Sequence, residues 1–460
     1  MALFPGAGPR LRRAIVFGGY AGPALSGMIF TLAPATYLPT FYSEEKGLAF
    51  ATVGLIFFAA RLWDAAIDPL LGAWSDRPVS WLGRRKAWLV ASTPALMAFT
   101  VLLFMPWFAV SPGYLLVVSL GWYTAYTAYH IPYLAWGAEI ATEYHERSVL
   151  VGLREITGLL GFFMAAGLII LAQGKGPDTI GLSLRIFSGA VLLIAPLTSI
   201  AATLLVPDDS GALVRRSGPQ PEDRDGSWQH NVAILLWNRP FLRLMAGVFL
   251  EILGLGAFTS LMELFVERGL GLPGRFNLLM AVTLLAAILT VPAMVWAAGR
   301  FGKHRVLIAG QGLYVIGFLS LYAVPPATLG LALPSFLVLG AGFATFSVLP
   351  ASILADIIDY GALKRAEWRP GLYMAASIFL SKLAFAAATG ASFGLLSLVG
   401  FDAKGANDDL RMTLFKAVAL ALPALLMVGA ALVLMGFPID RHRHQVIRRR
   451  LEMRAARAAI

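Results

Sequence analysis

Long apolar stretches, separated by short polar segments, run along nearly the whole chain. A helix needs about 20 apolar residues to cross the hydrocarbon of a bilayer. The stretches that meet this requirement are 14–41, 47–74, 86–106, 112–141, 149–172, 182–206, 241–266, 274–298, 304–323, 329–356, 370–398 and 411–437. The pattern therefore predicts an all-α membrane protein with twelve transmembrane helices. Prolines and glycines inside many stretches agree with this, since membrane helices tolerate both.

One polar segment, 207–240, is much longer than the others, and its centre is rich in charged residues, glycine and proline. We interpret it as a linker between two six-helix halves, with an amphipathic part at 228–237 that lies along the membrane surface. The predicted domains are an N-terminal six-helix bundle at 1–206, the cytoplasmic linker at 207–240, a C-terminal six-helix bundle at 241–437 and a basic cytoplasmic tail at 438–460.

Composition supports the membrane assignment. Of 460 residues, 58% are hydrophobic and 14% are charged, whereas a soluble domain has about 25% charged residues. The chain has no cysteine, which excludes disulfides and thiolate metal sites. The first apolar stretch is too long for the core of a signal peptide, so we expect it to be retained as a helix.

Basic residues gather on one side of the predicted membrane. Their clusters lie at 10–13, 77–86, 215–224, 299–305, 364–369 and 441–450, whereas the opposite side has little more than Lys46, Lys175, Arg268 and Lys404. Since loops rich in Lys and Arg stay in the cytoplasm, we expect both termini to be cytoplasmic in a bacterial inner membrane. This explains the net charge of +11 without nucleic acid. The tail is then a basic helix at the anionic inner leaflet or a solvated tail.

Two aspartates in the second stretch are the leading candidate site. Asp64 and Asp68 are four residues apart, so their side chains share one helix face about 5–6 Å apart at Cβ. Two such carboxylates repel each other in a low dielectric, and a proton or a cation that takes oxygen ligands relieves the repulsion. The pair therefore indicates a site for Na⁺ or H⁺. The alternative is structural ion pairing, of Asp64 with Arg61 or of Asp68 with Lys382.

Other polar residues lie deep in the predicted helices, where an ionisable group costs at least a few kcal/mol. Lys382, in the eleventh stretch, must face a cavity or a carboxylate, so we assign it and Arg61 to ion coupling, with a static buried pair as the alternative for Lys382. The candidate substrate-binding residues are Tyr20, Tyr126, His130, Arg154, Glu251, Tyr373 and Lys382. In the fourth stretch, tyrosines with Thr127 and His130 line a cavity or bond neighbouring helices. Glu155 is a possible neutralising partner of Arg154.

Two short basic turns echo each other in the predicted halves. Gly72 to Lys86 joins the second and third stretches, and Gly299 to Arg305 joins the eighth and ninth. The first turn resembles the loop signature of the major facilitator superfamily, whose members are built from repeated bundles. We assign a cytoplasmic gate to these turns, formed by Asp76, Arg77, Arg84, Arg85 and Lys303.

The stretch 60–72, with Arg61, Trp63, Asp64, Asp68 and Pro69, resembles the second helix of the glycoside–pentoside–hexuronide:cation symporters, the family of the melibiose permease. Similar motifs are Ile131-Pro132-Tyr133, Asn238-Arg239-Pro240-Phe241 and the stretch 355–361. The resemblance covers nearly the whole chain, and animal sodium-dependent lysophospholipid symporters share its outline. It implies a major facilitator fold of twelve helices in two halves.

The resemblance also implies roles for single residues. Asp64 and Asp68 match cation-site carboxylates, Thr127 a hydroxyl of that site and Lys382 a residue between the cation and substrate sites. Arg154 matches an arginine that contacts substrate. Departures from the melibiose permease are Pro23 and His130 in place of sugar-site aspartates, Leu134 in place of a tryptophan and Ile67 in place of a cation-site asparagine. They argue against galactoside recognition and favour H⁺ over Na⁺.

We therefore predict a secondary symporter that couples H⁺ or Na⁺ to a small solute, a sugar, a glycoside or a uronate-like anion, by alternating access. Its expected partners are substrate, coupling cation and lipid bilayer, and we expect a monomer with no cofactor and no metal beyond possible Na⁺ at Asp64 and Asp68. The alternatives are a lysophospholipid symporter or flippase and a non-transporting membrane sensor. We expect no enzyme activity, because no nucleophile–base constellation or nucleotide-binding motif is recognisable.

Overall fold

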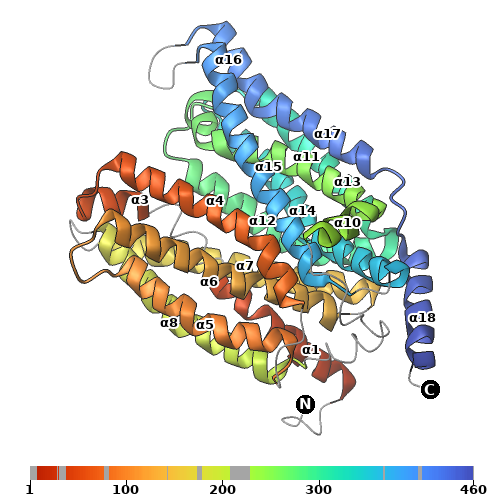
Figure 1. The fold of residues 1–460 in the computed structure, drawn as a ribbon. Helices are drawn as coiled ribbons and strands as arrows, with labels where there is room; N and C mark the ends of the chain where they lie inside the picture. Colours follow the sequence, from red (N-terminus) through yellow and green to blue (C-terminus); the bar gives the residue numbers. More distant parts are fainter. Residues whose placement is uncertain are drawn as a thin grey trace. The chain divides into compact units, whose positions relative to one another are not determined.

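The computed structural model describes residues 8–27, 30, 38–76, 82–141, 143–173, 179–207, 228–365, 368–401 and 407–458, and its regular structure within these ranges is all helical (Figure 1). The chain divides into two compact units. The first comprises Met1–Glu222, Arg365–Ala376 and Leu451–Ile460, and the second comprises Asp223–Lys364 and Ser377–Arg450. The gate candidate Arg77 and most of the predicted linker fall outside the described residues.

Helix α6 is central to the packing of the first unit, because it lies against both α4 and α5. Helix α8 packs against α5, α7 and α1. The helices of this unit are α1 (Pro9–Ala21), α3 (Leu38–Thr40) with a π-helical turn η1 (Phe41–Glu45), α4 (Phe50–Ser75), α5 (Arg84–Phe104), α6 (Pro112–Ile140), α7 (Tyr144–Gln173) and α8 (Thr179–Leu205). The α4–α6 contact brings the aspartates of the second predicted stretch to the hydroxyls of the fourth.

Helix α17 has a similar place in the second unit, where it packs against α11 and α13. The helices here are α10 (Trp228–Trp237), α11 (Arg239–Leu264) with η2 (Phe265–Gly269), α12 (Phe276–Phe301), α13 (Lys303–Ala323), α14 (Leu329–Arg365), α15 (Pro370–Val399), α16 (Asp409–Lys416), η3 (Ala417–Ala421), α17 (Leu422–Leu434) and α18 (Arg441–Ala458). The last residue of α14 and the first turns of α15 group with the first unit.

Most of the helices coincide with the predicted stretches to within a few residues, but α14 runs nine residues past the predicted end at 356. Nine helical segments in the described part of the chain are long and apolar enough to cross a membrane. Helix α4, which carries the three charged residues Arg61, Asp64 and Asp68, is not among them, and neither is the tyrosine-rich α6. The predicted stretch 14–41 is described only in part, as α1 and the residues near it. The predicted amphipathic segment and basic tail form α10 and α18.

Local sequence explains where several helices begin. Ser111 and Asn238 accept hydrogen bonds from the backbone N–H groups of Tyr114 and Phe241, at 3.2 and 3.1 Å, and so cap α6 and α11. Gly83 and Gly302 precede α5 and α13 with φ of 101° and 96°. L side chains rarely adopt this φ, so glycine is required at both turns. The turns that precede α5 and α13 therefore have the same backbone conformation.

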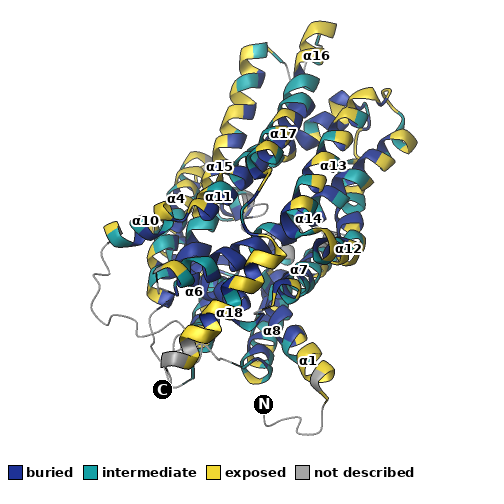
Figure 2. Cartoon of the chain, turned by 90° about the vertical axis from the view of Figure 1, so that its right-hand side faces the viewer, coloured by how far each residue is buried: buried dark blue, intermediate teal, exposed yellow. Residues whose placement is uncertain are grey.

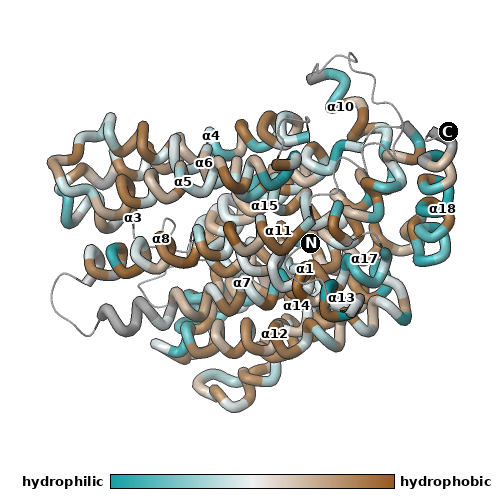
Figure 3. The backbone as a smooth tube through the Cα atoms, turned by 90° about the horizontal axis from the view of Figure 1, so that it is seen from below, coloured by the Kyte–Doolittle hydropathy of each residue, from teal (hydrophilic) through white to brown (hydrophobic). Residues whose placement is uncertain are grey.

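Each unit has its own hydrophobic core. In the first, Tyr20, Phe104 and Trp122 are among the largest buried side chains, and in the second, Phe265 and Phe318 are buried together. Many large apolar side chains are exposed, including Leu55, Leu289 and Trp296. Exposed positions line helices such as α13 and α15 in Figure 2, and Figure 3 shows that α12 is largely hydrophobic while α18 is largely hydrophilic. Such apolar outer faces suit contact with lipid.

Candidate functional site

Asp64 and Asp68 of α4 converge on one hydroxyl of α6. Thr127 Oγ1 lies 3.0 Å from Asp64 Oδ1 and 3.1 Å from Asp68 Oδ1. All three side chains are buried, at 2%, 1% and 2% exposure. The four-residue spacing places both carboxylates on the α6-facing side of α4, as the sequence predicts. We call Asp64, Asp68 and Thr127 the acid pair site.

The chemistry of a hydroxyl limits what this arrangement can be. Thr127 has a single O–H hydrogen, so it donates to one carboxylate at a time, and it accepts through its lone pairs. A proton on either aspartate would let that acid donate to Thr127 while Thr127 donates to the other. A small cation would instead take oxygen ligands from all three side chains. The geometry therefore suits a proton or a hard cation.

Aromatic and basic groups surround the acid pair site on the same two helices. The guanidinium of Arg61 lies over the ring of Tyr123, 5.3 Å from its centroid. Trp63 Nε1 donates to Thr124 Oγ1 at 2.9 Å, a further bond from α4 to α6. Both contacts join α4 to α6 on the N-terminal side of Asp64 along α4.

The fourth predicted stretch presents a row of stacked rings along α6. Tyr126 stacks on Trp122 with centroids 5.6 Å apart and an interplanar angle of 2°, and on His130 at 5.2 Å and 21°. The spacing of four residues stacks these side chains one above another on one helix face. Flat rings with polar edges can bind either a sugar face or a quaternary ammonium group.

Tyr20 and Arg154, two substrate candidates, already have protein partners. Tyr20 and Tyr133 stack at 4.8 Å, and the hydroxyl of each donates to the backbone carbonyl of the other, at 3.3 and 2.9 Å. Arg154 donates to Glu155 Oε1 at 2.5 Å, so the neutralising partner predicted from sequence is present. A substrate role for either residue stays a prediction.

The other candidates lie elsewhere. Tyr373 is buried near the start of α15, in the part that groups with the first unit. Glu251 of α11 and Lys382 of α15 belong to the second unit; Glu251 is fully buried and Lys382 is partly exposed. The pairing of Lys382 with the aspartates therefore stays a prediction.

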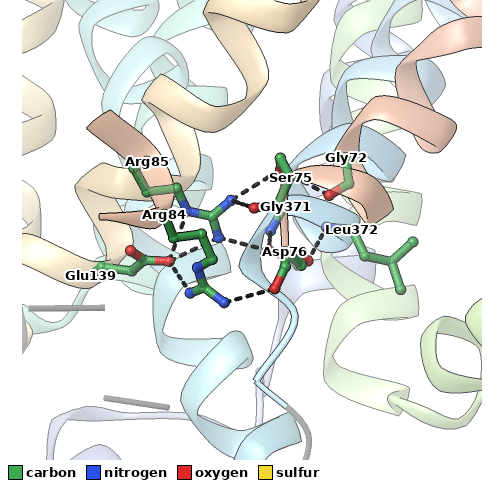
Figure 4. A network of polar contacts seen from close by, with 8 residues as sticks. All are labelled: Gly72, Ser75, Asp76, Arg84, Arg85, Glu139, Gly371 and Leu372. Carbon is green, nitrogen blue, oxygen red and sulfur yellow. Dashed lines mark hydrogen bonds and ion pairs between the residues drawn. The ribbon is translucent and has the colours of Figure 1, made fainter. Parts of the chain in front are cut away.

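A dense charge network joins the ends of α4, α5 and α6, and Figure 4 shows its side chains. Arg85 donates to Asp76 Oδ1 at 2.6 Å, to Glu139 Oε1 at 2.8 Å and to the Ser75 carbonyl at 2.9 Å. Arg84 donates to Glu139 Oε1 at 2.6 Å and to the Asp76 carbonyl at 3.0 Å. Both arginines are buried, and two acids balance their charge. We call Ser75, Asp76, Arg84, Arg85 and Glu139 the first network.

Asp76 also caps the start of α15. Its Oδ1 accepts from the Gly371 N–H at 2.9 Å and its Oδ2 accepts from the Leu372 N–H at 3.0 Å (Figure 4). These N–H groups have no intrahelical acceptor, and a carboxylate there is favoured by the helix dipole. Glycine is needed at 371, because a Cβ there would clash with the Gly72 carbonyl and the Ser75 hydroxyl.

The second unit has a corresponding network where α13 meets α14. Lys303 Nζ donates to Asp356 Oδ2 at 2.6 Å, and His444 of α18 lies 3.1 Å from Asp359 Oδ2 and 3.5 Å from Asp356 Oδ1. Arg448 lies 3.9 Å from Asp359 Oδ1. We call Lys303, Asp356, Asp359, His444 and Arg448 the second network. It attaches the basic C-terminal helix to the unit.

Sequence reasoning did not find Glu139, Gln311 or His444 as partners. Glu139 could have been found, because it is an acid at the predicted cytoplasmic end of the fourth stretch, on the same side of the membrane as Arg84 and Arg85. Gln311 and His444 had none, since only the fold brings them to Glu251 and Asp359. Among the described residues, no cluster of three or more His, Cys, Asp or Glu is arranged to hold a metal ion.

Solved structures with the same fold include several transporters. The proton:xylose symporter XylE is similar with a TM-score of 0.69 and 15% identity over 93% of this chain and 96% of the other. The transporter FucP, in the outward conformation, is similar with a TM-score of 0.66 and 15% identity over 93% and 100%. The fold is therefore that of the major facilitator superfamily.

Sequence relatives are more specific. The human sodium-dependent lysophosphatidylcholine symporter 1 is 27% identical over 433 residues, which is 87% of this chain and 79% of that protein. Its Xenopus tropicalis counterpart is 26% identical over 87% and 82%. The uncharacterized symporter YnaJ of Bacillus subtilis is 23% identical over 95% and 94%. These relatives do not single out the melibiose permease branch that the motifs resemble.

One family model matches almost the full length of the chain. It is described as MFS/sugar transport protein, and it matches residues 19–441. The match spans both units and includes the acid pair site, the first network and Lys303, Asp356 and Asp359 of the second network, whereas His444 and Arg448 lie beyond it. The chain, a multi-pass membrane protein, therefore belongs to the MFS/sugar transport protein family of transporters.

Proposed function

We propose that the protein is a cation-coupled symporter in which the acid pair site binds the coupling ion. The observation that carries this proposal is the convergence of two buried carboxylates on the Thr127 hydroxyl. Two carboxylates and a neutral hydroxyl carry up to two negative charges at membrane depth, and such charges cost several kcal/mol unless a proton, a cation or a basic side chain balances them. Ion binding therefore changes the charge that the two helices must bury. It can shift the equilibrium between conformations that bury this charge to different extents.

Two substrate classes fit this proposal. The named relatives are lysophosphatidylcholine symporters, which favours a lysophospholipid, the alternative from sequence reasoning. A sugar is the second candidate, supported by the description of the family model.

We further propose that the first and second networks lie on the cytoplasmic side and steady one conformation of the alternating-access cycle. The basic residues of both networks fit the excess of Lys and Arg on that side. Transport would then require the Asp76 contacts with the first turn of α15 to break and re-form. The proposed location is a bacterial inner membrane with both termini in the cytoplasm.

The test is uptake by proteoliposomes, with radiolabelled lysophosphatidylcholine, a glycoside and a uronate, each with an imposed Na⁺ or H⁺ gradient. We expect one gradient to drive accumulation of one substrate class. Asp64→Asn should reduce gradient-driven accumulation tenfold or more, because it removes one ionisable ligand of the site. The matched control is Asp409→Asn, an exposed acid of α16 that should behave like wild type. Accumulation that needs no gradient, or that Asp64→Asn leaves intact, would contradict the proposal.

A further inference from the structure

Another buried carboxyl lies at the centre of α11 in the second unit and belongs to neither network. Glu251 is 0% exposed and sits at the centre of α11, about 18 Å along the helix from either end at 1.5 Å per residue. Its Oε2 accepts a hydrogen bond from Gln311 Nε2 of α13 at 3.1 Å. No lysine, arginine or histidine in the described part of the chain forms an ion pair with it. A charge at such a place is costly.

Three polar atoms around this carboxyl are buried without a hydrogen-bond partner. They are Glu251 Oε1, Gln311 Oε1 and the Tyr314 hydroxyl oxygen. Gln311 and Tyr314 are also buried, at 0% and 2% exposure. Buried polar atoms in proteins nearly always have hydrogen-bond partners. Three unpartnered atoms around one acid therefore need a common explanation.

A single proton satisfies two of the three atoms. A carboxylic acid and a primary amide pair through two hydrogen bonds, in which the amide N–H donates to the acid carbonyl and the acid O–H donates to the amide carbonyl. The first of these bonds is the Gln311-to-Glu251 bond. The two unpartnered oxygens, Glu251 Oε1 and Gln311 Oε1, are the pair that the second bond would join. Only a proton on Glu251 turns these two acceptors into donor and acceptor.

Tyr314 supplies what the ionised acid would need. Its hydroxyl is a buried donor without an acceptor, one helical turn from Gln311 on α13. Tyr314 lies close enough to Glu251 for the acid's charge to act on its hydroxyl, so after the proton leaves, this hydroxyl is the donor at hand for Glu251 Oε1. The site therefore offers a hydrogen bond to each protonation state of the acid, which a purely structural neutral acid does not require.

The elements packed against α11 carry few charged groups. Helix α13 has Lys303, His304 and Arg305 at its start, α15, whose Ala388 lies against Gly256, has Lys382, and α17 with η3 contains no titratable residue. The charged groups of the elements that flank α11, His230 of α10 and Glu267 and Arg268 of η2, lie near its ends. We propose that Glu251, Gln311 and Tyr314 form a proton-binding site in the second unit, independent of the acid pair site.

The experiment is infrared spectroscopy of the purified full-length protein in liposomes near neutral pH. The carbonyl stretch of a protonated carboxylic acid is separate from that of a carboxylate. We expect the difference between wild type and Glu251→Gln to contain one such band, in which any protonated Asp64 or Asp68 cancels. Glu263→Gln, an exposed acid of the same helix, is the matched control and should lack it. Absence of the band from the Glu251→Gln difference spectrum would overturn the proposal.

Two further variants separate proton binding from damage to the fold. The exchange Glu251→Gln with Gln311→Glu keeps the acid–amide pair and should restore the band. Tyr314→Phe removes the donor for the ionised form, so the band should persist to higher pH, with proton affinity raised about tenfold. No band in the exchanged protein, or an unchanged titration in Tyr314→Phe, would contradict the site. The measurement needs no substrate, so its failure leaves the symport proposal intact, and the reverse also holds.

Discussion

The first and second networks occupy matching places in the two units but are completed differently. In both, a helix begins directly after a glycine with positive φ, and its first residue is a buried cation that pairs with an acid of a neighbouring helix: Arg84 with Glu139, and Lys303 with Asp356. The first network then ends on the backbone of α15, whereas the second ends on side chains of α18.

The difference lies in how many bonds each cation makes. Arg85 contacts Asp76, Glu139 and Ser75 through its planar guanidinium, a fork of donors that no lysine can reproduce. Lys303 makes one short ion pair and a 3.3 Å bond to the Ser352 carbonyl. The two units therefore share the geometry of the glycine turn but use it differently. The first network bonds to the backbone at the start of α15, and the second network holds the C-terminal helix α18.

The largest effect should follow removal of Arg85. Arg85→Ala leaves Asp76 and Glu139 short of a buried counter-charge, which costs about 3–5 kcal/mol. Lys303→Ala should cost less, since His444 stays 3.5 Å from Asp356. Thermal unfolding of purified protein in detergent would rank the two. Arg85→Lys is the informative control and should fall nearer to the alanine variant than to wild type. Equal melting temperatures for Arg85→Ala and Lys303→Ala would remove the distinction between the networks.

The sequence predicts the helices better than their partners. Periodic apolar stretches and the four-residue spacing of Asp64 and Asp68 are local properties, so the twelve stretches and the shared face of the aspartates follow from them. The polar pattern of its stretch singled out Thr127, but its place in the cation site was predicted only through the family resemblance. The link between Glu251 and Gln311 joins residues 60 apart, and that between Asp359 and His444 joins residues 85 apart. Such contacts depend on helix packing, which no local pattern encodes.

A smaller effect should follow removal of His444. His444→Ala takes away the α18 side chain nearest to Asp359, so the helix should detach more readily while the rest of the unit stays folded. We expect trypsin to cleave within 441–450 at least several times faster than in wild type, with little change in melting temperature. Arg449→Ala, an exposed neighbour on the same helix, controls for altered cleavage sites. If both variants are cut at the wild-type rate, the second network does not attach α18.

The smallest effect tests whether the two turns are truly alike. Gly83 and Gly302 differ by only a few degrees in φ, 101° against 96°. Alanine at either position should therefore lower the free energy of unfolding by a similar amount, about 1–2 kcal/mol, from backbone strain alone. Gly8, which precedes α1 with φ of −63°, is the matched control, because alanine there meets no such strain. Melting temperatures of the three variants give the comparison. If Gly83→Ala is far more damaging than Gly302→Ala, strain at the turn is being passed to Arg84 and Arg85, whose several bonds cannot adjust. A gap of that kind would show that the first network, and not the shared glycine geometry, sets the rigidity of its turn.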